Sequence, residues 1–104
     1  LFMIVFNTTF HVEEDIQEEF IEYMLQEFIP ASTKSGMLKF PRLARVFGKD
    51  EDEGLSFAME FQVVDIVVME KWKSEESNSV FAPLMDRFKE KMIGFSTLMQ
   101  TIDY

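Results

Sequence analysis

The opening segment, residues 3–12, alternates between large apolar side chains and largely polar ones. One parity carries the apolar residues Ile4, Phe6, Phe10 and Val12. The other parity comprises Val5, Asn7, Thr9 and His11. Because successive side chains of a strand point to opposite faces, this pattern predicts a strand with one face on a core and one open face.

Residues 13–29 repeat their apolar side chains at helical spacing instead. The main stripe consists of Ile16, Phe20, Met24 and Phe28, with Ile21, Leu25 and Ile29 beside it. Glu13, Glu14 and Asp15 supply the negative charge that a helix N-terminus favours. We expect Pro30 to kink or restart this helix and Gly36 to end it.

Two further strands are predicted after a loop at residues 36–41. The first covers residues 42–48, and residues 49–54 form a polar turn. The second strand, residues 55–63, alternates cleanly, with Ser56, Ala58, Glu60 and Gln62 on its polar side. Arg42 and Arg45 have opposite parity, so only one of them can reach the open face, and the pattern leaves open which one.

A second helical region is predicted from Asp65, a plausible N-cap, with Val68, Met69 and Trp72 on one face. We expect the polar residues 74–79 to interrupt it, and a further helix to run to about Met92. Because of Pro83, the pattern does not decide at which residue that helix begins. A last strand follows from Gly94. The order strand, helix, strand, strand, helix, strand predicts one domain over residues 1–104, an α+β ferredoxin-like fold with an antiparallel sheet and helices on one face.

Composition and charge reduce the number of function classes that fit this chain. Twelve Phe and eight Met favour self-association, and the absence of Cys excludes disulfides and thiolate chemistry. A net charge of −9 disfavours nucleic acid and anionic membranes. No apolar run is long enough to span a bilayer or to act as a signal peptide, so we expect a cytoplasmic protein. The acidic turn lacks the spaced ligands of a calcium loop, and no metal or cofactor is expected.

Four segments carry a resemblance to a known family. They are Met3-Ile4-Val5-Phe6-Asn7-Thr8-Thr9-Phe10-His11-Val12, Pro41-Arg42-Leu43-Ala44-Arg45-Val46, Glu70-Lys71-Trp72 and Gly94-Phe95. The whole chain resembles an uncharacterised family of small bacterial proteins, a domain of unknown function. This resemblance implies a fold but no activity. Because its pattern starts at Met3, we expect Leu1 and Phe2 to precede the natural beginning of the protein.

The layout is also similar to the dimeric α/β barrel superfamily, in which two ferredoxin-like subunits place their open sheet faces together around a cavity. Small haem-degrading monooxygenases of that superfamily use an Asn on the first strand, a Trp in the second helical region and an iron-ligating His roughly ten residues later. Asn7 and Trp72 have comparable places, but Ala82 stands where the His is expected. We therefore expect no haem.

Two functions remain open from the sequence. The protein is predicted to be a homodimer that binds a small molecule or serves as an interaction module. The alternative is a cofactor-independent monooxygenase or isomerase. The basic run from Lys34 to Lys49 favours a small anionic ligand. The candidate binding residues are Asn7, His11, Arg42, Arg45, Glu60 and Trp72, although Trp72, His11, Asn7 and Glu60 each also fit a purely structural role.

Overall fold

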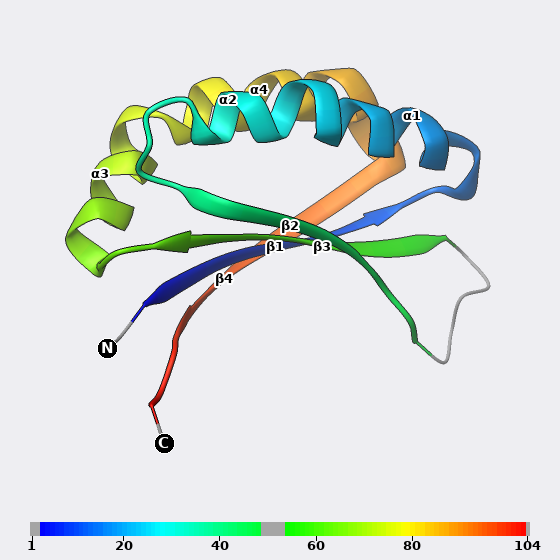
Figure 1. Ribbon diagram of the computed structural model, residues 1–104. Coiled ribbons are helices and arrows are strands. Elements are labelled where there is room, and N and C mark those ends of the chain that lie inside the picture. The colour runs from blue at the N-terminus through cyan, green and yellow to red at the C-terminus, as the bar shows by residue number, and fades with distance from the viewer. Residues whose placement is uncertain (1–2, 49–53, 104) are drawn as a thin grey trace.

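The computed structural model describes residues 3–48 and 54–103. Four strands form one antiparallel sheet in the order β2-β3-β1-β4. Their bounds are β1 Ile4–Val12, β2 Lys39–Val46, β3 Leu55–Val63 and β4 Met92–Gln100. All described helices lie in one layer over one face of the sheet, and none of the described segments covers the other face (Figure 1). The predicted ferredoxin-like architecture is confirmed.

The helical layer comes from the two crossovers. Between β1 and β2 the chain forms a 3-10 turn η1 (Glu14–Ile16), α1 (Gln17–Tyr23), a π-helical segment η2 (Met24–Phe28) and α2 (Ile29–Thr33). Between β3 and β4 it forms α3 (Ile66–Glu75), α4 (Ser77–Phe88) and a 3-10 turn η3 (Lys89–Lys91). None of these described helices has the length and apolar character needed to cross a bilayer.

The π-helical segment explains why a strict four-residue stripe stays buried. In an α-helix of 3.6 residues per turn, positions four apart drift around the axis. The wider π turn compensates for that drift. Ile16, Phe20, Met24 and Phe28 all remain in the core as a result. Pro30 lies in the first turn of α2, and Phe28 and Ile29 before it are already helical, so the chain continues from the π-helical segment into α2 across the proline.

Several predicted boundaries differ from those observed. β2 begins at Lys39, inside the expected loop, and α4 follows α3 after Glu76 alone, so the polar residues 74–79 hardly interrupt the helices. Pro83 lies inside α4. The helix ends at Phe88 and β4 begins at Met92, both earlier than expected. Residues 1–2, and residues 49–53 of the turn predicted at 49–54, lie outside the described residues.

The core lies between the sheet and the helices. Strand register places Phe6 opposite Phe61 and Phe10 opposite Phe57, and all four side chains are buried. Directly paired residues share a face, so the predicted faces of β1 and β3 are confirmed. The opposite, uncovered side of the sheet is called the open face below.

Candidate functional site

The central row of the open face runs across all four strands. Asn7 on β1 pairs with Glu60 on β3 and with Thr97 on β4, and Arg42 on β2 pairs with Glu60. The Arg42 guanidinium donates to Oε1 of Glu60 at 2.9 Å. The register therefore brings three of the six predicted site residues together.

The structure also decides between the two arginines. Arg45 pairs with Phe57, a core residue, so its parity is that of the helix side. Its guanidinium carbon lies 5.1 Å from the centre of the Phe47 ring. Arg42 is the arginine on the open face, but its charge is already balanced by Glu60. An anionic ligand there would have to compete with that ion pair.

His11 lies at the end of the open face, four residues from Asn7 on the same strand. Its Nδ1 is 3.1 Å from the hydroxyl of Ser56, on the paired strand. Asn7 donates through Nδ2 to the hydroxyl of Thr9 at 3.1 Å. Its Oδ1 is buried without a hydrogen-bond partner among the described residues. Asn7 and His11 thus have different hydrogen-bond partners and do not form one group.

Trp72 lies on the other side of the sheet and cannot join this group. It is 1% exposed, and its indole N–H donates to the backbone oxygen of Ser32 at 3.2 Å. Its ring packs 5.6 Å from Phe6 and 6.5 Å from Phe81, measured between ring centres. Trp72 thus has a position in the core, and it also lines a cavity.

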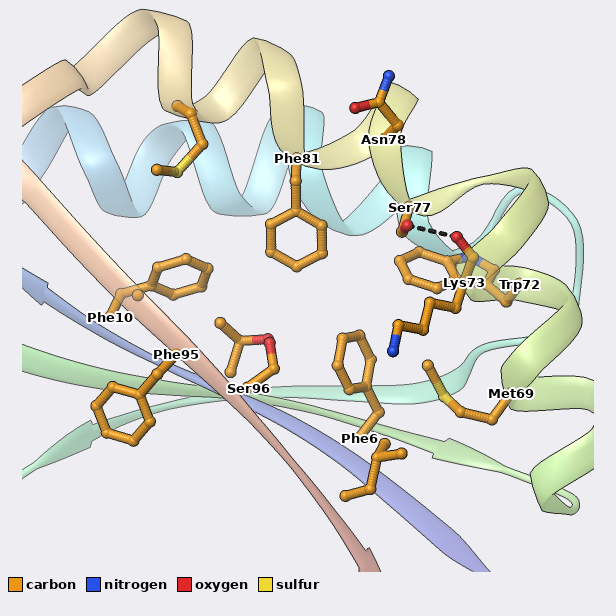
Figure 2. Close-up of a pocket in the computed structure, with 14 residues that line it drawn as sticks. Phe6, Phe10, Met69, Trp72, Lys73, Ser77, Asn78, Phe81, Phe95 and Ser96 are labelled. Atoms are coloured by element: carbon orange, nitrogen blue, oxygen red, sulfur yellow. Dashed lines mark hydrogen bonds between the residues drawn. The ribbon is translucent and has the colours of Figure 1, made fainter.

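That cavity, the helix-side pocket, lies between α3, α4 and the β1–β4 edge of the sheet (Figure 2). It has a volume of about 590 Å³ and is open to solvent on one side. Its walls are mainly apolar and include Phe6, Phe10, Met69, Trp72, Phe81, Met85, Phe95 and Leu98. Volumes of 300–1,000 Å³ are typical of small-molecule sites. This pocket is large enough to hold one.

The pocket exists because β4 carries small residues on its helix side. Gly94 and Ser96 lie opposite Phe10 and Thr8. A Cβ added to Gly94 would lie 2.8 Å from the Phe10 ring, so no side chain fits there. β4 is an edge strand whose residues 93–100 are all exposed. The space above β4 is therefore left unfilled.

Five polar residues complete the lining. They are Thr8, Lys73, Ser77, Asn78 and Ser96. The hydroxyls of Thr8 and Ser96 lie 2.9 Å apart on the sheet side. Ser77 donates to the backbone oxygen of Lys73, and the Lys73 side chain extends from α3 toward Phe6 and Ser96 (Figure 2). Lys73 is the one charged side chain that lines the pocket within residues 3–48 and 54–103.

Sequence reasoning missed this pocket apart from Trp72. The signal was present in Thr8, a polar residue on the apolar parity of β1, between Phe6 and Phe10. A second signal was the small pair Gly94 and Ser96 on one parity of the last strand. At both places a small or polar side chain stands where a large apolar one would have filled the space between the sheet edge and the helices.

Metal chemistry has no support in residues 3–48 and 54–103. No group of three His, Asp or Glu side chains gathers there in a way that could hold a metal ion.

Comparison with known proteins places the chain in a family. Residues 3–102 match the model of the domain of unknown function DUF4286. The chain belongs to this family. No curated protein matches it.

Solved structures share the fold across nearly the whole chain. A dimeric ferredoxin-like protein from an uncultured marine organism is 15% identical, with a TM-score of 0.70 over 99% of this chain and 97% of that one. SnoaB, a cofactor-independent oxygenase from Streptomyces nogalater, is 14% identical, with a TM-score of 0.66 over 98% and 95%. A hydroxynitrile lyase from Passiflora edulis is 14% identical, with a TM-score of 0.63 over 92% and 93%. These neighbours share the ferredoxin-like fold of the chain.

Proposed function

We propose that the protein is a homodimeric small-molecule-binding protein that holds its ligand in the helix-side pocket. The observation that carries the proposal is the pocket itself, about 590 Å³ of mainly apolar space with a few polar groups at its edges. A pocket filled by the protein's own side chains would instead have favoured an interaction module.

The dimer is proposed to form through the open face. Three apolar side chains of β4 are exposed on this face. The exposed fraction is 67% for Ile93, 64% for Phe95 and 43% for Met99. By register, these side chains share the face of Asn7 and His11. A second copy would remove this apolar strip from water. The partly polar centre of the open face, where the Arg42 side chain is 71% exposed, is suited to hydrogen bonds across such an interface.

The alternative function, a cofactor-independent monooxygenase or isomerase, has weaker support. SnoaB is described as a cofactor-independent oxygenase and shares the fold. Such chemistry needs a group that takes a proton from the substrate. Among the residues that the structure describes, neither an imidazole nor a carboxylate lines the helix-side pocket, and His11 lies on the other side of the sheet. Binding is therefore the better supported function.

The binding proposal is tested by blocking the pocket. A library of neutral bicyclic aromatic compounds is screened by ligand-observed NMR against the wild type, Met85→Trp and Asp86→Trp. Met85 lines the pocket and Asp86 does not, although both are exposed on α4. Compounds that bind the wild type and Asp86→Trp but not Met85→Trp support the proposal. Absence of any wild-type binder, or equal binding by both variants, contradicts it.

The dimer is tested separately by light scattering coupled to size exclusion at micromolar concentration. Ile93→Glu, on the open face, is compared with Val67→Glu on α3, because the two side chains are 67% and 72% exposed. We expect Val67→Glu to remain a dimer and Ile93→Glu to become a monomer of about 12.3 kDa. A wild type that stays at 12.3 kDa over this range refutes the dimer.

A further inference from the structure

The Lys73 ammonium is the feature of the helix-side pocket that neither the fold nor the core requires. Its side chain is exposed and leans over the pocket toward Phe6 and Ser96 (Figure 2). Within the part of the chain that the structure describes, Lys73 forms no ion pair. This is so although the chain has 19 acidic residues and only ten basic ones. A cation without a carboxylate partner therefore lies at the mouth of an apolar cavity.

The neighbouring acids do not neutralise it. Glu70 and Glu76 lie three residues before and after Lys73 on the α3–α4 segment, where side chains of a helix can meet. Neither forms an ion pair with it. The position differs from that of Arg42, whose guanidinium is already bound by Glu60 at 2.9 Å. Of these two cations, Lys73 has the charge available for a ligand.

The walls of the pocket indicate what kind of apolar group a ligand would place inside it. The Phe6 ring packs against Phe81 with 6.5 Å between ring centres, and Phe10 lines the opposite end of the pocket. Aromatic rings prefer offset and edge-to-face contacts with other rings, which adds to the gain from burying apolar area. The Met85 thioether also lines the pocket, and sulfur packs favourably against rings. A flat aromatic group matches these walls.

We propose that the helix-side pocket binds an aromatic monocarboxylate, with its ring system among the phenylalanine side chains and its carboxylate at the Lys73 ammonium. This inference rests on the proposed function, because it assumes that the pocket is the binding site. It moves the anionic ligand expected from the sequence away from the arginines of the basic run. The ligand would then have one charged contact, with Lys73 at the opening of the pocket, and apolar contacts inside it.

The test compares two probes that differ only in charge. 2-Naphthoate and the neutral 2-naphthamide are titrated by calorimetry into the wild type, Lys73→Met and Lys71→Met. Lys71 is the matched control, since it is exposed on the same helix but does not line the pocket. We expect the wild type and Lys71→Met to bind the acid about fivefold more tightly than the amide, in keeping with an exposed ion pair. Lys73→Met should bind the two probes equally.

The outcomes separate this inference from the function on which it rests. If the wild type binds amide and acid equally, the carboxylate assignment is overturned while binding in the pocket stands. If neither probe binds and the neutral library also gives no binder, both proposals fail. Preference for the acid that survives in Lys73→Met overturns the assignment, and its loss in Arg42→Ala would place the carboxylate on the open face instead.

Discussion

Trp72→Phe is the substitution that tests the packing around the pocket most directly. The indole is 1% exposed and contacts Phe6 and Phe81, so the smaller ring leaves an internal void. Partial truncation of a buried side chain of this kind costs about 1–2 kcal/mol. The exchange also removes the indole hydrogen bond to the Ser32 carbonyl.

That carbonyl belongs to the last turn of α2, where backbone oxygens have no partner within the helix. Leaving a buried acceptor unpaired costs about 1 kcal/mol more. The free energy of unfolding should therefore fall by about 2–3 kcal/mol, since both losses occur in the folded state. The expected effect is large compared with the total stability of a small domain.

The measurement is urea unfolding followed by far-ultraviolet circular dichroism at one fixed protein concentration, because a dimer's stability depends on concentration. Tyr23→Phe is the control. Tyr23 is half-buried, and its hydroxyl has no hydrogen-bond partner within the described residues, so the change should stay within about 0.5 kcal/mol. A loss below about 0.5 kcal/mol for Trp72→Phe would refute the packing and the hydrogen bond described here.

Three further predictions concern other parts of the molecule. Gly94→Ala should lower stability by about 1–3 kcal/mol in the same unfolding assay, because the new Cβ would lie 2.8 Å from the Phe10 ring; an unchanged midpoint contradicts this. The hydrogen bond from Lys91 holds the pKa of Asp15 below its ordinary value of 3.8. The pair therefore stabilises the fold above pH 3.8, and this stabilisation is lost as the pH falls through the lower folded-state pKa. Asp15→Asn should accordingly flatten the loss of thermal stability between roughly pH 5 and pH 2, and an unaltered acid limb would be evidence against it. Because Ala82 replaces the expected axial histidine, haemin titration should give no saturable one-to-one complex with a shifted Soret band, and such a complex would overturn the expectation.

The sheet could be predicted from the sequence where burial is one-sided. Residues of β1 and β3 alternate between core and open face, so the two-residue period alone identified both faces. β2 could not be assigned in this way. Its pairing shifts between Lys39 and Arg42, and Phe40 adopts a positive φ of 52°. Such a bulge changes the parity of everything that follows it, and periodicity does not reveal it.

The candidate site was harder to predict because a pocket is defined by what is missing. The polar residues Asn7 and His11 drew attention to the open face, where they are satisfied mainly by Thr9 and Ser56. The helix-side pocket arises from small residues at the edge strand and from the position of α4 above them. Lys73 has the sequence context of an ordinary exposed helical lysine, and only the tertiary arrangement places it at a cavity.

The alternation of β4 has a thermodynamic consequence. Gly94, Ser96 and Leu98 line the helix-side pocket, while Ile93 and Met99 lie on the open face proposed to form the dimer. One strand would thus separate the proposed ligand from the proposed second subunit by the thickness of a backbone. If ligand binding shifts β4 enough to change the dimerisation constant, dimerisation must change the ligand's affinity by the same factor, because linkage is reciprocal. Ligand affinity measured across a range of protein concentrations would then report on subunit assembly, and the two equilibria would have to be analysed together.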